Sequence, residues 1–135
     1  MAVLLTPIDD CPDSVLGIRR SIEPHKGGIA LPAGYLETKE VWRVGAAREL
    51  FEETGVVVPP DSIQVFDVES SPTNPNVLLV FCVTPSIPRI PEDFVPNAEV
   101  SELLPLYLRT ETAFDIHTKM MRRFLTTDRI LKFPT

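Results

Sequence analysis

Residues Gly34–Val56 read GYLETKEVWRVGAARELFEETGV, and the interpretation of the whole chain starts from this stretch. It carries five glutamates, with Gly34 at its start and Gly55 near its end. Five residues separate Gly34 from Glu40, and seven separate Glu40 from Arg48. Acids at such intervals form either a solvated face or a site that holds a cation.

The segment Glu40–Thr54 is predicted to be a helix. Thr38 is a candidate N-cap, and Gly55 can take the left-handed conformation that ends a helix. At about 100° per residue, three glutamates share one face of this helix, namely Glu49, Glu52 and Glu53. On the opposite side, apolar residues are expected to face the core, namely Val44, Ala47, Leu50 and Phe51.

Clustered carboxylates on a packed helix repel one another, and a divalent cation relieves that repulsion. Oxygen ligands favour magnesium, manganese or calcium over zinc. The flank of the helix supports a metal site over a solvated face, because residues 31–34 are turn-prone and Gly34 permits a close backbone approach. Gly45 in mid-helix costs about 1 kcal/mol relative to alanine, so it is expected to mark close packing.

The spacing resembles the Nudix signature Gx5Ex7REUxEExGU, with U an aliphatic residue, at every position from Gly34 to Val56. The resemblance implies an α/β/α sandwich with a mixed central sheet and two main helices. It also implies a hydrolase that uses Mg²⁺ or Mn²⁺ to cleave a nucleoside diphosphate linked to another group. Gly34, Glu40 and Gly55 would then be structural residues of the motif.

The resemblance also implies roles for the residues around the metal. Glu52 and Glu53 are expected to be direct ligands, and Glu49 completes the cluster or binds a second ion. The carbonyl of Ala33 would join the metal shell. Arg48 would orient the motif glutamates through ion pairs, and with Glu52, Glu53 and a general base it makes up the predicted catalytic set.

The general base can come from a later loop, as it often does in Nudix proteins. The acids of the proline-punctuated segment 85–105 are the candidates, namely Glu92, Asp93, Glu99 and Glu102. Glu99 is preferred, because residues 97–100 resemble the place where pyrophosphatase-type Nudix chains carry an acid entering a late strand. A loop acid without a role, or a motif glutamate acting as the base, remains the alternative.

Residues Arg20–Pro24, followed by Gly28 and the run Leu31–Glu37, look like ADP-ribose and NADH pyrophosphatase-like Nudix proteins. Arg20 would touch a substrate phosphate, with Arg19 competing for that role, or it is an ordinary arginine at the end of a strand. No SQPWPFPxS-type segment follows the motif, which puts NADH in doubt. ADP-ribose or a related dinucleotide is favoured. The alternatives are an oxidised nucleoside triphosphate, or a regulatory module that binds nucleotides without turnover.

The composition limits the number of domains, the partners and the cellular compartment that we expect. The 135 residues, 44% of them hydrophobic, are expected to form one domain, residues 1–135. A net charge of -6 argues against duplex nucleic acid as a partner and leaves a small nucleotide possible. Cys11 and Cys82 suggest reduced thiols in a cytoplasmic protein, and no membrane span or leader is visible. A homodimer is possible.

Other segments complete the expected fold. Strands are predicted at Ala2–Pro7, Val15–Ile22, Ile63–Val68 and Val77–Val83. Near the end, Thr112 and Asp115 form a weak capping pair for a second helix. Its apolar stripe is Phe114, His117, Met121, Phe124 and Leu125. His117, lying on that stripe, is expected to be a structural histidine.

Overall fold

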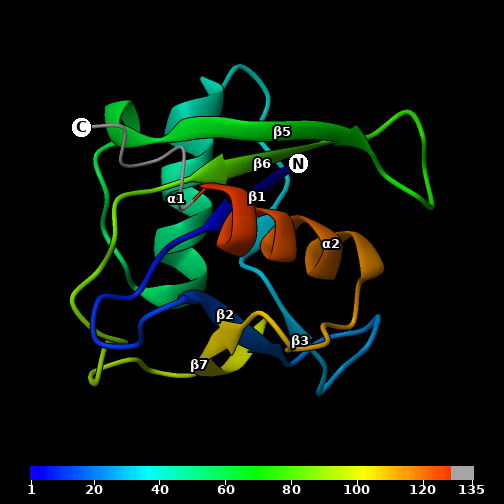
Figure 1. Ribbon diagram of the computed structural model, residues 1–135. Helices are drawn as coiled ribbons and strands as arrows, with labels where there is room; N and C mark the ends of the chain where they lie inside the picture. The colour runs from blue at the N-terminus through cyan, green and yellow to red at the C-terminus, as the bar shows by residue number, and fades with distance from the viewer. Residues whose placement is uncertain (129–135) are drawn as a thin grey trace.

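The computed structural model describes residues 1–128 as two sheets between two main helices (Figure 1). The strands are β1 (Ala2–Leu5), β2 (Ser14–Arg20), β3 (Ile29–Ala30), β4 (Ala33–Gly34), β5 (Gln64–Ser70), β6 (Leu78–Val83) and β7 (Val100–Tyr107). The helical elements are α1 (Trp42–Thr54), the 3₁₀ turn η1 (Pro60–Ser62), α2 (Asp115–Arg123) and the π turn η2 (Phe124–Asp128).

The larger sheet is mixed and has the strand order β4-β1-β6-β5. Strands β1 and β6 run parallel, and the other two pairings are antiparallel. The smaller sheet, β3-β2-β7, is antiparallel. In Figure 1, β5 and β6 cross the upper part of the molecule and β2, β3 and β7 lie below.

Strand β1 divides the core in two, because successive side chains of a strand point to opposite faces. Ala2 and Leu4 pack in one cluster with Leu50 of α1. Val3 and Leu5 pack in another cluster, which contains the buried methionines of α2. Helices α1 and α2 therefore cover opposite faces, with α1 behind the strands and α2 in front (Figure 1). The predicted α/β/α sandwich is confirmed.

The predicted strands correspond to β1, β2, β5 and β6, with ends displaced by up to two residues. The two-residue strands β3 and β4 were not predicted, since they are too short to carry a period. The bounds of β7 were missed as well, because Pro105 interrupts its apolar pattern. Proline is tolerated there because β7 is an edge strand of the smaller sheet.

Helix α1 begins at Trp42, so the predicted start at Glu40 and the N-cap at Thr38 were wrong. Val41 is at the N-cap and makes no side-chain cap bond. A turn precedes it, in which the Glu40 N–H donates to the Glu37 carbonyl at 3.1 Å. Lys39 within that turn has a φ of 66°, which is a left-handed conformation, so the right-handed helix cannot extend back through this residue. The helix ends as predicted, at Gly55 with a φ of 79°.

The assignment of helix faces was partly wrong. Leu50 is buried, but Val44 is 47% exposed and Phe51 is 54% exposed. Glu53, predicted on the outer face, is only 5% exposed. The segment that leads into α1 covers the glutamate side of the helix, as the contacts of Gly34 and Gly45 described below demonstrate. Val44 and Phe51 are therefore on the part of the helix that faces outward.

The predicted apolar stripe is present, with His117 and Met121 buried on α2 and Phe124 and Leu125 buried on η2. The predicted capping pair was wrong, because the N-cap is Phe114 and it makes no side-chain cap bond. The Thr112 hydroxyl lies 2.8 Å from that of Thr118 instead. Within the described part of the chain, neither helix has the length and apolar character required to cross a membrane.

Candidate active site

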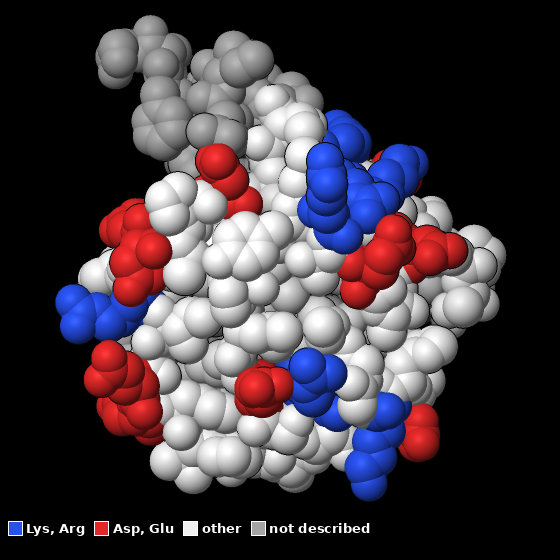
Figure 2. Space-filling view, turned by 60° about the horizontal axis from the view of Figure 1, so that its bottom comes forward, with Lys and Arg blue, Asp and Glu red and all other residues white. Residues whose placement is uncertain are grey.

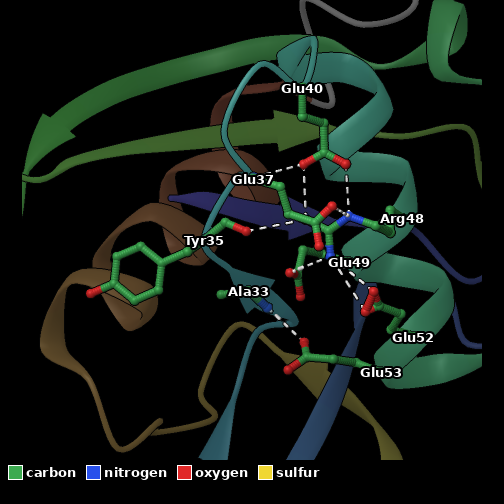
Figure 3. A network of polar contacts seen from close by, with 8 residues as sticks. All are labelled: Ala33, Tyr35, Glu37, Glu40, Arg48, Glu49, Glu52 and Glu53. Atoms are coloured by element: carbon green, nitrogen blue, oxygen red, sulfur yellow. Dashed lines mark hydrogen bonds and ion pairs between the residues drawn. The ribbon is translucent and has the colours of Figure 1, made fainter.

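Arg48 lies at the centre of a polar network on α1 (Figure 3). Its Nε donates to Glu40 Oε2 at 2.7 Å, and its Nη2 donates to Glu40 Oε1 at 2.9 Å. Its Nη1 donates to Glu49 Oε1 at 2.8 Å and to Glu52 Oε1 at 2.9 Å. Nη2 also reaches the Tyr35 carbonyl at 3.2 Å. A single guanidinium thus holds carboxylates from both ends of the motif.

The two-pronged pair between Arg48 and Glu40 is sheltered, since the side chains are 22% and 10% exposed. The bonds from Arg48, followed by the backbone N–H of Glu37, lower the pKa of the Glu40 carboxyl to about 2. The same pair raises the pKa of Arg48 above its usual value. Glu40 is therefore an ionised anchor for Arg48 at neutral pH.

Two glycines create the room for these carboxylates. A Cβ on Gly34 would lie 2.0 Å from the Glu49 carboxylate. A Cβ on Gly45 would lie 2.6 Å from Glu40 Oε1. The expected close approach at Gly34 and close packing at Gly45 are both present.

Glu53 is buried beside the strand that precedes the motif. The Ala33 N–H donates to Glu53 Oε1 at 2.8 Å (Figure 3). Burial raises the pKa of Glu53 to about 8, although the bond from Ala33 opposes the shift. The nearby carboxylates of Glu99 and Glu49 raise this pKa further. Ala33 therefore meets Glu53 through its amide, while its carbonyl remains a predicted ligand.

Glu49 lies in the same crowd of acids. Burial raises the pKa of the Glu49 carboxyl, while the bond and charge of Arg48 lower it. Repulsion from Glu52 and Glu99 adds to the rise. Three carboxylates from two distant segments, those of Glu49, Glu53 and Glu99, thus lie close enough to disturb one another.

The candidate bases occupy different surroundings. Glu99 is the one whose charge acts on Glu49 and Glu53. The Glu102 carboxylate instead accepts a bond from Arg19 Nε at 2.8 Å. Asp93 lines a pocket next to the site. Of these three acids, Glu99 is the one whose charge acts on the motif glutamates, and its role as the base remains a prediction.

The two arginines at the end of β2 have partners within the protein. Besides Glu102, Arg19 donates from Nη1 to the Gly27 carbonyl at 2.9 Å. Arg20 donates to the Pro24 carbonyl at 2.8 Å, and its guanidinium lies 5.2 Å from the centre of the Phe114 ring. A substrate role for either arginine remains a prediction.

His117 is structural, as expected. Its Nδ1 accepts the Leu31 N–H at 3.2 Å, and the side chain is buried between the rings of Phe81 and Phe114. Burial, with a smaller effect of the Arg20 charge, lowers the pKa of His117 to about 4. The imidazole is therefore neutral at physiological pH.

The donor set fits a hard divalent cation, because carboxylate oxygens crowd a cradle that a Cβ at Gly34 would fill. With the side chains as they stand, however, no three His, Cys, Asp or Glu residues in the described part of the chain converge as a metal site. Arg48 holds Glu49 and Glu52, while Glu53 is turned to Ala33. The cation would therefore compete with Arg48 for the glutamates.

A pocket of about 390 Å³ adjoins the C-terminal end of α1. It lies between Phe51 and Glu52 of the helix and residues 93–97 of the loop that joins β6 to β7. Its size is within the range of small-molecule sites. Charged side chains on the face drawn in Figure 2 form small groups around a broad uncharged area. The blue groups on that face each lie beside red ones.

Known proteins resemble the chain in sequence and in fold. An ADP-ribose pyrophosphatase of Methanocaldococcus jannaschii is 37% identical over 71 residues, which are 53% of this chain but only 41% of that relative's length. A Caenorhabditis elegans Ap4A hydrolase complex has a TM-score of 0.72 at 14% identity and covers 98% of both chains. The NUDIX domain of Shewanella oneidensis NrtR, complexed with ADP ribose, has a TM-score of 0.70 at 22% identity and covers 93% of this chain and 86% of that one.

At these identities the two structures establish the fold alone, and the family follows from the sequence. The NUDIX domain model matches residues 1–124. That range contains the whole stretch from Gly34 to Val56 and every described element up to α2. The chain belongs to the NUDIX family.

Proposed function

We propose that this protein is a metal-dependent pyrophosphohydrolase that cleaves a nucleoside diphosphate linked to another group. The observation that carries the proposal is the intact set of motif glutamates, held by Arg48 and crowded against Glu99. Gly34 and Gly45 support it, because a Cβ at either position would collide with the carboxylate of Glu49 or Glu40. A domain that had lost turnover would have no need to retain every one of these groups.

In this proposal, Glu52 and Glu53 are the principal ligands of Mg²⁺ or Mn²⁺, with Glu49 and the Ala33 carbonyl beside them. The bound cation supplies charge neutralisation at the diphosphate and polarisation of its oxygens. Arg48 keeps Glu49 and Glu52 in place before the cation binds.

The proton from the attacking water goes to Glu99, which would act as the general base. Arg20, with Arg19 as the alternative, would donate to a diphosphate oxygen. Arg20 is bound only to a carbonyl and an aromatic ring in the described contacts, so its guanidinium can still donate elsewhere.

ADP-ribose or a related dinucleotide is the favoured substrate. The segment Arg20–Pro24 and the M. jannaschii relative, named as an ADP-ribose pyrophosphatase, support this choice. An oxidised nucleoside triphosphate is the rival substrate. The rival class of function is a regulatory module that binds nucleotides without cleaving them.

The test is a substrate panel with Mg²⁺ or Mn²⁺, comprising ADP-ribose, dinucleotides, nucleotide sugars and triphosphates. We expect release of a mononucleotide from at least one diphosphate-linked substrate. Glu52→Gln should abolish most of that turnover and leave the unfolding midpoint unchanged, because the Glu52 side chain is 51% exposed. Glu69→Gln, on strand β5, is the matched control and should keep the wild-type rate.

The outcomes separate the candidate functions. Metal binding without turnover of any panel member would favour the regulatory module. Turnover of triphosphates alone would show that the proposed substrate is wrong and that the proposed reaction, cleavage of a pyrophosphate bond, is right. Wild-type rates in Glu52→Gln would remove the role given to this glutamate.

A further inference from the structure

Asn97 organises the turn that leads to Glu99. Its side-chain Oδ1 accepts the N–H groups of Glu99 and Val100, each at 3.0 Å. Its own N–H donates to the Val100 carbonyl at 2.9 Å. Because two N–H donors meet Oδ1, the orientation of the amide is determined and Nδ2 must point the other way.

Nδ2 points to the end of α1. It lies 3.5 Å from the Glu52 carbonyl and 3.4 Å from the Glu53 carbonyl. Both carbonyls belong to the last turn of the helix, where no later helical N–H is available to them. One amide side chain thus joins the backbone of two proposed metal ligands to the backbone of the proposed base.

The far side of Glu99 is held as well. Its carbonyl accepts the Ser21 N–H at 2.8 Å, next to the end of β2. The bond to Ser21 fixes the Glu99 backbone relative to β2, and the bond to Asn97 fixes it relative to α1. The bond to Ser21 does not involve α1, whereas the Nδ2 contacts of Asn97 connect the Glu99 turn to the backbone of the motif glutamates.

We propose that Asn97 is a positioning residue, which sets the distance between the Glu99 carboxylate and the cation-binding glutamates of α1. The inference rests on the proposed hydrolase function and identifies a residue that acts through the backbone of Glu99. Its effect on rate follows from geometry, because a misplacement of about 1 Å can cost about 10² in rate.

The test is a double-mutant cycle on the full chain, using the best substrate of the panel. Asn97→Ala should lower kcat by about 10- to 100-fold with little change in KM. In the Glu99→Gln background the same substitution should have almost no further effect, since the group that Asn97 places is already absent. Asn97→Asp keeps the acceptor but loses the donor to α1, so its kcat should fall between wild type and Asn97→Ala.

Asn74 offers a matched control. In the β5–β6 turn its Oδ1 accepts the Asn76 N–H at 3.3 Å, a similar local bond away from the motif. Asn74→Ala should leave kcat and KM unchanged. The unfolding midpoint of each variant reports whether it is folded, and Asn97→Asp with Glu99→Gln repeats the cycle if Asn97→Ala does not fold.

Amide hydrogen exchange tests the bonds from Asn97 to the Glu99 and Val100 amides without substrate. In Asn97→Ala, the amides of Glu99 and Val100 should exchange at least several-fold faster than in wild type. Unchanged exchange would overturn the inference. So would a loss of kcat in Asn97→Ala that is equally large with and without Glu99→Gln, and the proposed function would then stand. A wild-type protein that turns over no substrate defeats the proposed function itself, and the inference with it.

Discussion

At the scale of single residues, Arg48 explains why the motif needs an arginine. Its guanidinium donates to Glu40 through two nitrogens and to Glu49 and Glu52 through a third. A lysine carries its donors on one compact ammonium and cannot span these separate carboxylates. Arg48 therefore holds the carboxylates of Glu40, Glu49 and Glu52 in position without a bound cation.

His117 provides a pH dependence of stability. Its pKa in the fold is about 4, below the ordinary 6.5, because the buried imidazole is kept neutral. Between these two values the unfolded chain binds a proton that the folded chain excludes. The free energy of unfolding is therefore unaffected by His117 above pH 6.5 and decreases as pH falls towards 4. The decrease from this residue has an upper limit of about 3 kcal/mol.

Urea unfolding of wild type and His117→Gln between pH 4 and 7 measures this contribution. The glutamine can still accept the Leu31 N–H but does not titrate. We expect the free energy of unfolding to fall more steeply with decreasing pH in wild type than in the variant. Parallel curves would show that His117 is not the titrating group.

At the scale of elements, α1 demonstrates where helical periodicity succeeds and where it fails. Spacing correctly grouped the glutamates, because the 3.6-residue period depends only on backbone geometry. It misplaced Val44 and Phe51, because a helix can be buried on its polar side when another segment covers that side. The covering segment is residues 34–40, whose position depends on the turn at Lys39.

Gly45→Ala is expected to destabilise the protein, although alanine favours a helix by about 1 kcal/mol. Its Cβ would lie 2.6 Å from Glu40 Oε1 and 2.7 Å from Leu36 Cδ2. Glu40 cannot move away freely, because Arg48 and the Glu37 N–H hold its carboxylate. We expect a net loss of about 1–3 kcal/mol by chemical denaturation.

Val44→Ala is the control, on the exposed side of the same helix, and should change stability by less than about 0.5 kcal/mol. A Gly45→Ala variant as stable as wild type would mean that residues 36–40 can shift without cost. Close packing would then no longer account for the glycine.

At the scale of the whole molecule, the two halves of the core support different helices. Leu4 and Leu5 are both fully buried neighbours on β1, yet Leu4 packs on the α1 side and Leu5 on the α2 side. Replacing either with alanine should cost about 2–5 kcal/mol. Only Leu4→Ala leaves its cavity beneath the helix that carries the glutamates.

We therefore expect Leu4→Ala to lower turnover at a temperature where both variants remain folded, and Leu5→Ala to retain the wild-type rate. Circular dichroism establishes the folded fraction, and kcat with the best panel substrate gives the comparison. Equal loss of turnover in the two variants would mean that the two halves of the core are mechanically coupled.

The sequence by itself determined the family and the order of most elements, and it carries the reaction class that we propose, because these depend on spacing along one continuous stretch. The roles predicted for Gly34, Gly55 and the glutamates between them depend on local backbone geometry. Only the tertiary structure decided that Glu53 is buried, that Glu99 crowds it and that Asn97 links their segments. Burial and hydrogen bonding between segments more than 40 residues apart depend on how strands pair and loops pack, which the local pattern of residues does not encode.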